Sequence, residues 1–205
     1  MDNFKGKKVL IVGFGVEGKA LAKFMLEEGA NVTIADKKNL EDFPDEEINE
    51  FKDRGVEFIN GESYLDSLED FELICFSPGI KYEAYKKVKE SGKKTLTQIQ
   101  LFMERCKAKT VGVTGTNGKG TTTTLIYEIL KAAGKKVYLG GNIGEEVLHL
   151  LPELSEEDWV VLELSSFQLR DLTISPHVGV VLNITSDHLD IHQTQMSCAS
   201  IADDI

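Results

Sequence analysis

The 205-residue sequence has few cysteines and no long hydrophobic run. Its three cysteines, Cys75, Cys106 and Cys198, are far apart and odd in number, and no Cys-x-x-Cys pair occurs. This pattern indicates reduced thiols in a cytosolic protein rather than a disulfide framework or a cysteine-based metal site. No stretch approaches the roughly 20 apolar residues that span a bilayer, and the apolar run after Lys8 is too short for a secretory signal. We therefore expect a cytoplasmic protein that has no membrane partner.

Positive charge is also in deficit. The chain has 23 lysines and arginines against 34 aspartates and glutamates, and a net charge of −11. The global basic surface of a nucleic-acid-binding protein is absent, so we expect no nucleic-acid partner. An acidic chain can still bind anionic ligands, because glycine loops and helix N-termini bind phosphates locally. The length permits one large domain or two modest ones, and we expect a monomer.

Residues 7–36 have the pattern of a nucleotide-binding βαβ unit. The order is an apolar strand at 7–12, glycines at 13, 15 and 18, a helix at 19–29 and a second strand at 31–35. Asp36 follows the second strand at the distance where an acidic residue meets a ribose in dinucleotide-binding folds. This context predicts a Rossmann-like domain. It leaves the ligand open between a mononucleotide and a dinucleotide, so an NAD-dependent oxidoreductase is an alternative.

Another strand is predicted at Glu72–Phe76, and it ends in Ser77-Pro78-Gly79-Ile80. That turn would lie at the carboxyl edge of a parallel sheet, where open α/β sheets bind ligands. The segment is equally compatible with a plain turn. The polar stretch Arg105–Lys109 marks the predicted end of this domain, which therefore spans residues 1–107.

The glycine-rich stretch 111–124, VGVTGTNGKGTTTT, predicts a phosphate-binding loop between a strand and a helix. Backbone N–H groups and the helix N-terminus would bind phosphate oxygens, and Lys119 would reach the outer phosphates. The predicted nucleotide-binding residues are Gly115, Thr116, Asn117, Gly118, Lys119, Gly120, Thr121 and Thr122. The usual motif places a Ser or Thr for Mg²⁺ directly after the lysine. Because Gly120 stands there, the hydroxyl is expected from Thr121 or Thr122. A simple glycine turn is the alternative.

Polar side chains follow two other predicted strands of this region. Glu163 ends the strand at 159–164, and His188 follows the strand at 177–182. Because the carboxyl ends of parallel strands meet at one edge, we expect Lys119, Glu163 and His188 to lie close together. Carboxylate and hydroxyl oxygens are typical Mg²⁺ ligands, so the pattern predicts a Mg·ATP site. The alternatives are a carboxylate that accepts loop hydrogen bonds and a histidine that caps a loop.

Four segments, in order, resemble the Mur ligases, the ATP-dependent amide ligases of bacterial peptidoglycan synthesis. They are TGTNGK at 114–119, GNIG at 141–144, ELSSFQL at 163–169 and NITSDHLD at 183–190. With the glycine turn and SPGI of the first domain, ELSSFQL is most similar to the members that add D-glutamate to UDP-N-acetylmuramoyl-L-alanine. The resemblance covers residues 1–190. It also implies that the first glycine turn binds a uridine nucleotide rather than NAD.

The resemblance implies a role for each matching residue. The UDP part of the substrate would be bound by Gly15, Val16, Glu17, Asp36, Lys37 and Gly79. The muramoyl part would be bound by Asn142, Ser165 and Gln168. Lys119 would bind the ATP phosphates, and Glu163 and His188 would bind magnesium. The implied reaction is phosphorylation of the substrate carboxylate by ATP to an acyl phosphate, which the amine of D-glutamate then attacks.

The sequence departs from this family pattern in three respects. Gly120 replaces a hydroxyl residue, a shift that the related folylpolyglutamate synthases tolerate, although those enzymes lack the first domain. No lysine follows Lys136, whereas the family has a carbamylated, metal-bridging lysine beyond the position of His188. The family's third domain is missing. We therefore expect a Rossmann-like domain at 1–107, a partial P-loop-type ATP domain at 108–190 and a non-family tail at 191–205. The chain would be a truncated fragment that binds nucleotide without catalysis.

Overall fold

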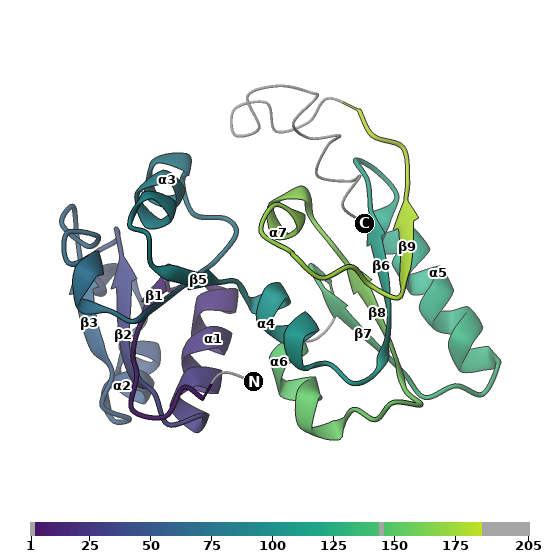
Figure 1. The fold of residues 1–205 in the computed structure, drawn as a ribbon, viewed down its shortest axis with the longest axis horizontal. Helices are drawn as coiled ribbons and strands as arrows, with labels where there is room; N and C mark the ends of the chain where they lie inside the picture. The colour runs from purple at the N-terminus through teal and green to yellow at the C-terminus, as the bar shows by residue number, and fades with distance from the viewer. Residues whose placement is uncertain (1–2, 144–145, 186–205) are drawn as a thin grey trace. The chain divides into compact units, whose positions relative to one another are not determined.

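The computed structural model describes residues 3–143 and 146–185. The chain divides into two compact units, Met1–Gln98 and Ile99–Ile205. Each contains an all-parallel β-sheet with helices (Figure 1), which confirms the predicted α/β class. The division precedes the predicted 107–108 boundary. The start of the second unit is hydrogen-bonded to the rest of that unit. The side-chain carbonyl of Gln100 accepts a hydrogen bond from the Thr173 N–H at 2.9 Å.

The first unit is a five-stranded sheet in the order β3-β2-β1-β4-β5 (Figure 1). Its elements are β1 (Lys8–Val12), α1 (Val16–Glu27), β2 (Asn31–Asp36), η1 (Leu40–Asp42), α2 (Asp45–Lys52), β3 (Glu57–Asn60), η2 (Leu68–Asp70), β4 (Leu73–Phe76), α3 (Tyr82–Glu90) and β5 (Lys94–Leu96). Val12 at the end of β1 pairs with Ala35 of β2 and Phe76 of β4. The three strands therefore end at the same level, and the turns that follow them meet at one edge of the sheet.

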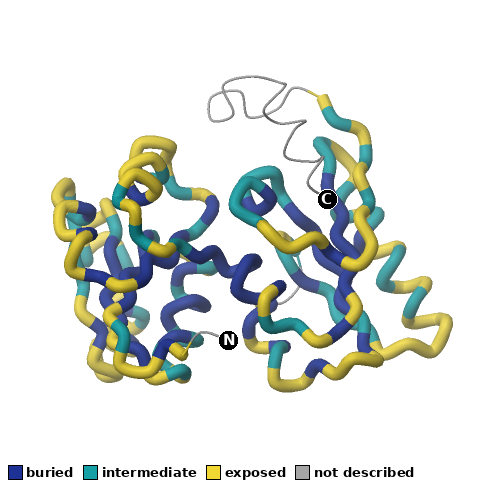
Figure 2. The backbone as a smooth tube through the Cα atoms, in the orientation of Figure 1, coloured by how far each residue is buried: buried dark blue, intermediate teal, exposed yellow. Residues whose placement is uncertain are grey.

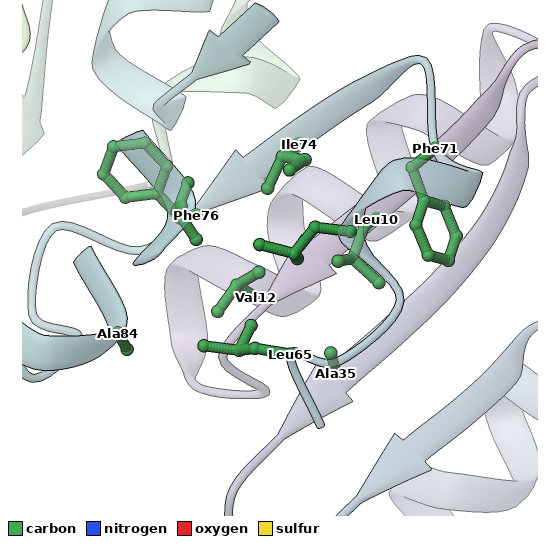
Figure 3. Packing of buried hydrophobic residues seen from close by; sticks show 10 residues of the cluster. Leu10, Val12, Ala35, Leu65, Phe71, Ile74, Phe76 and Ala84 are labelled. Carbon is green, nitrogen blue, oxygen red and sulfur yellow. The ribbon is translucent and has the colours of Figure 1, made fainter. Parts of the chain in front are cut away.

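The central strands of this sheet are buried on both faces. Residues 9–12 of β1 and 73–76 of β4 are all buried (Figure 2). On one face, Leu10 and Val12 pack in a cluster that includes Ile74 and Phe76 (Figure 3). A parallel strand covered on both faces is a continuous apolar run, which is why KVLIV and LICF were recognisable from sequence.

The second unit contains a four-stranded sheet in the order β7-β8-β6-β9 (Figure 1). Its described elements are α4 (Gln98–Arg105, which begins one residue before the division), β6 (Lys109–Thr114), α5 (Lys119–Ala132), β7 (Val137–Gly141), α6 (Val147–Leu150), η3 (Leu151–Glu153), β8 (Trp159–Glu163), α7 (Ser166–Leu169) and β9 (Val178–Val181). Glu163 at the end of β8 pairs with Val113 of β6 and Gly141 of β7. Glu163 is thus placed between the loop after β6 and the turn after β7. Across the described residues, no helix is long and apolar enough to cross a membrane.

The two described cysteines are free thiols. Cys75 lies buried in β4, and burial raises the pKa of its thiol far above the ordinary value. Burial also raises the pKa of Cys106, although a backbone hydrogen bond to Ala108 acts in the opposite direction. Because the thiolate is the reactive form, both side chains are poor nucleophiles near neutral pH.

Candidate functional site

A cleft of about 670 Å³ lies in the first unit at the edge where β1, β2 and β4 end. Of the residues predicted to bind the UDP part, Gly15, Asp36, Lys37 and Gly79 line this cleft. Val16 and Glu17 are not among the lining residues. Glu17 nevertheless lies beside the cleft, since its carboxylate accepts a hydrogen bond from the hydroxyl of Ser77, a lining residue, at 3.3 Å. The structure thus brings most of the predicted set together.

The carboxylate of Asp36 organises the glycine turn. Its Oδ2 accepts the backbone N–H of Phe14 at 2.7 Å, and its Oδ1 accepts the N–H of Lys38 at 2.9 Å. An ionised carboxylate has about four acceptor positions, so Asp36 retains capacity for a ligand donor such as a hydroxyl or an imide N–H. Asp36 therefore has a structural role in addition to the ligand role that the sequence predicted.

The segment that runs from the end of β1 into the first turn of α1 requires two of its three glycines. Gly13 has a φ of +96°, in the region that favours glycine. At Gly18, an added Cβ atom would lie 1.8 Å from the carbonyl oxygen of Gly13. At Gly15, an added Cβ atom would meet nothing within 4 Å. Gly18 thus permits the close approach of α1 to the end of β1.

Sequence reasoning missed Tyr64 and Lys81, which also line the cleft. The pKa of Tyr64 is raised by burial first and by the nearby carboxylates of Asp36 and Glu62, so its hydroxyl remains a hydrogen-bond donor at neutral pH. Lys37, Lys38 and Lys81 line the cleft, whereas Asp36 is the one carboxylate among the described lining residues. This balance of charge favours an anionic ligand. No motif in the sequence marks Tyr64, because its position depends on how the segment after β3 folds back.

The loop between β6 and α5 has the geometry of a phosphate-binding loop. Gly115 and Gly118 have φ values of +142° and +85°. Gly112 lies inside β6, where an added Cβ atom would come 2.8 Å from the Pro176 side chain. Gly112 is therefore a packing residue of β6 rather than part of the loop.

The structure separates the loop donors into two groups. The Thr116 N–H donates to the carbonyl of Asn183 at 2.9 Å, and the Thr116 hydroxyl is hydrogen-bonded to the backbone of Thr185. Thr116 therefore anchors the loop to the segment after β9. The first hydrogen bond of α5 runs from the Thr122 N–H to the Gly118 carbonyl, so the N–H groups of residues 119–121 have no i−4 acceptor within the helix. The ammonium of Lys119 lies over the loop, 2.7 Å from the carbonyl oxygen of Gly115.

Glu163 is buried, with 4% of its surface exposed, and it is held by Asn142. The Asn142 side-chain amide donates to Oε1 of Glu163 at 3.0 Å, and the Asn142 backbone N–H donates to the Glu163 carbonyl at 2.9 Å. Gly141, with a φ of +94°, makes this possible, because a Cβ atom there would lie 2.2 Å from the Glu163 carbonyl oxygen. Asn142, predicted as a substrate contact, orients the carboxylate in this structure.

The predicted metal ligands are only partly described. His188 lies outside the described residues. Thr121 is exposed and Thr122 is half-buried, while a Cβ atom on Gly120 would be 3.1 Å from Oε2 of Glu163. Within residues 3–143 and 146–185, no group of three His, Cys, Asp or Glu side chains could hold a metal ion. Of the predicted metal ligands, the structure describes Thr121 and Glu163.

Ser165 and Gln168, predicted to contact the substrate, form hydrogen bonds with each other. The Ser165 N–H donates to Oε1 of Gln168 at 3.0 Å, and the Gln168 N–H donates to the Ser165 hydroxyl at 3.3 Å. This is a capping box at the start of α7. Its signal, Ser-x-x-Gln, was present in the sequence and could have predicted the short helix. A substrate role for these two residues remains a prediction.

Two α/β units, one with a cleft at a glycine turn and one with a phosphate-type loop beside a buried carboxylate, define a nucleotide-binding protein. Residues 7–97 match the sequence model of the Mur ligase MurD-like N-terminal domain, and residues 113–201 match that of the Mur ligase middle domain. The chain belongs to the Mur ligase family. The second match continues to residue 201, beyond the residue at which family sequence was expected to end.

Known relatives agree with this assignment. The chain is 44% identical over 191 residues to the UDP-N-acetylmuramoylalanine–D-glutamate ligase of Clostridium acetobutylicum, covering 92% of this chain and 41% of the relative. It is 43% identical over 198 residues to the ligase of the same name from Clostridium kluyveri, covering 94% and 43%. The fold is similar to that of the UDP-N-acetylmuramate–alanine ligase of Thermotoga maritima, with a TM-score of 0.53, 21% identity and coverage of 95% and 46%. The chain thus spans less than half the length of these relatives.

Proposed function

We propose that this chain supplies the nucleotide-substrate unit and the ATP loop of a cytoplasmic ligase that adds D-glutamate to UDP-N-acetylmuramoyl-L-alanine. The proposal rests on the agreement between the two family matches and the geometry of the two units. Each matched domain lies in a unit that has its own nucleotide-type edge, the cleft at Asp36 in one and the Lys119 loop in the other. The relatives that carry both domains are named for this reaction.

The edges of the two sheets would bind different ligands. In the first unit, the cleft would bind the uridine diphosphate, with Asp36 and the Tyr64 hydroxyl toward polar groups and the lysines toward the phosphates. In the second unit, the N–H groups of residues 119–121 and the Lys119 ammonium would bind ATP phosphates. The terminal phosphoryl group would pass to the substrate carboxylate, and the amine of D-glutamate would then displace phosphate. The protein's contribution to such a transfer is mostly positioning and charge neutralisation. Magnesium, when bound, would neutralise charge on the phosphates, and Glu163 is the described residue suited to hold it.

The first test is the choice of nucleotide in the cleft. We expect calorimetry on the full 205-residue chain to show UDP binding at least tenfold more tightly than NADH, about 1.4 kcal/mol. The reason is that the lysines around the cleft favour a compact diphosphate and the family relatives act on UDP-linked substrates. Binding of NADH with no binding of UDP would refute the uridine assignment and favour an oxidoreductase.

A matched pair of lysine variants, one at the N-cap of α3 and one within α3, shows whether the ligand occupies this cleft. Lys81→Gln removes a cleft charge and should weaken UDP binding by about twofold to fivefold, the effect typical of an exposed charge. Lys86→Gln changes the same helix away from the cleft lining and should leave UDP affinity unchanged. Equal effects of the two substitutions would place UDP elsewhere.

The second test concerns the loop. Lys119→Met should weaken ATP binding by about 10-fold to 100-fold in EDTA, because it removes a charge-assisted hydrogen bond worth about 1.5–3 kcal/mol. The control is Lys135→Met, an exposed lysine after α5. Titration with a fluorescent ATP analogue measures both. If Lys119→Met binds ATP as the unchanged chain does, the loop is not the ATP site.

A nucleotide-binding polypeptide without turnover is the second candidate. It is motivated by the sequence, in which no lysine follows Lys136, whereas the family pattern has a metal-bridging lysine beyond the position of His188. Phosphate release that depends on ATP, D-glutamate and UDP-N-acetylmuramoyl-L-alanine together separates the two candidates. Robust release by these 205 residues would rule out the non-catalytic one.

A further inference from the structure

The carboxylate of Glu163 faces a position that carries no side chain. Its Oε1 is held by the Asn142 amide at 3.0 Å. Its Oε2 is 3.1 Å from the point where Gly120 would carry a Cβ atom. Among the described residues, Oε2 accepts no hydrogen bond. The outward oxygen of a buried carboxylate is therefore directed at the first turn of α5, where the side chain is a single hydrogen atom.

The threonines that follow Gly120 leave the helix on other sides than position 120. Successive helix residues are rotated by about 100°, so Thr121 and Thr122 project in different directions from Gly120. Thr121 is exposed. Thr123 is buried, and its hydroxyl donates to the Lys119 carbonyl at 2.8 Å within the same helix. A hydroxyl group opposite Oε2 would therefore have to come from position 120.

We propose that Gly120 removes the hydroxyl ligand of the nucleotide-bound metal, so that this chain binds ATP with little help from Mg²⁺. The proposal rests on the proposed role of the Lys119 loop in binding ATP. Phosphate loops place a Ser or Thr directly after the lysine because its hydroxyl binds the Mg²⁺ that bridges the phosphates. Here the lysine and the carboxylate are in place, and the hydroxyl between them is absent. Position 120 thus determines whether metal and nucleotide bind cooperatively.

Gly120→Ser would place a hydroxyl group next to Oε2 of Glu163. The contact of 3.1 Å is close, but it involves the far end of a side chain rather than the backbone, so a small movement of the carboxylate can accommodate a Cβ atom. Gly120→Ala adds the same Cβ atom without the hydroxyl, so it is the matched control. Combining Gly120→Ser with Glu163→Gln removes the charge that would hold the metal.

The experiment is titration of each variant of the 205-residue chain with a fluorescent ATP analogue, in EDTA and in excess MgCl₂. In the unchanged chain and in Gly120→Ala, Mg²⁺ should change the affinity by less than about threefold. In Gly120→Ser, Mg²⁺ should raise the affinity for the ATP analogue by at least about tenfold, which is a tenfold lower Kd. The Glu163→Gln double variant should lose this gain. Mn²⁺ relaxation enhancement in the presence of ATP, an independent reading of metal in the site, should be larger in Gly120→Ser than in the unchanged chain or in Gly120→Ala.

The outcomes are distinct. A Mg²⁺ response in the unchanged chain as large as that of Gly120→Ser would overturn the proposal, as would equal responses in the Ser and Ala variants. Binding of ATP that depends on Lys119 but shows no Ser-specific response would overturn this inference and leave the loop as the ATP site. Failure of every variant to bind ATP would overturn both.

Discussion

Gly18→Ala is expected to destabilise the first unit by about 3–5 kcal/mol. The added Cβ atom would lie 1.8 Å from the carbonyl oxygen of Gly13, a distance at which the backbone must move. Overpacking in a tight site costs about 1–3 kcal/mol, and more where the neighbour is backbone. The shift would separate α1 from the end of β1 and distort the turn that lines the cleft. UDP binding should therefore be lost together with stability.

The control is Gly15→Ala, in the same turn. Gly15 has a φ of −85°, and a Cβ atom there meets nothing within 4 Å. Its cost should stay within about 1 kcal/mol, the usual difference between residues at a helix N-cap. The single tryptophan, Trp159, lies in β8 of the second unit. Far-UV circular dichroism should therefore show an early transition for Gly18→Ala, while the fluorescence transition of Trp159 stays near its original temperature. Identical melting curves for the two variants would contradict the packing argument.

The architecture was predictable because its signals are local. Strands buried on both faces are apolar throughout, as in KVLIV and WVVLE, and glycine turns follow β1 and β6 in the order that nucleotide-binding folds use. The edge positions of Asp36 and Glu163 followed from the same rule, since each residue ends a parallel strand. Residue roles taken from the family pattern depended on the same local motifs.

The precise contacts were not predictable, because they depend on register and on how separate turns meet. Glu163 faces Gly120 because β8 pairs with β6 at Val113 and with β7 at Gly141. No spacing in the sequence shows that Asn142 would turn onto that carboxylate. Tyr64 reaches the cleft through a segment without regular structure. In contrast, the capping box of Ser165 and Gln168 has a local sequence signal, Ser-x-x-Gln. From the sequence, these two residues were interpreted only as substrate contacts.

Gly141→Ala is expected to destabilise the second unit by about 3–5 kcal/mol and to displace Glu163. Two costs combine at this position. The φ of +94° costs a non-glycine residue about 1–2 kcal/mol, and the added Cβ atom would lie 2.2 Å from the Glu163 carbonyl oxygen. Relief of that contact requires the end of β7 to move away from β8, which breaks the Asn142 hydrogen bonds to Glu163. The thermal transition followed by Trp159 fluorescence measures the loss of stability, because Trp159 lies at the opposite end of β8 from Glu163.

Gly134→Ala separates the two costs. Gly134 has a similar φ of +74°, but a Cβ atom there meets nothing within 4 Å, so only the backbone cost of about 1–2 kcal/mol remains. The difference between the variants, about 2–3 kcal/mol, then measures the approach of β7 to Glu163. If both variants lower the Trp159 transition equally, the close approach is not maintained in solution. Gly141 would then be needed only for its turn, and the orientation of Glu163 toward Gly120 would lose its structural support.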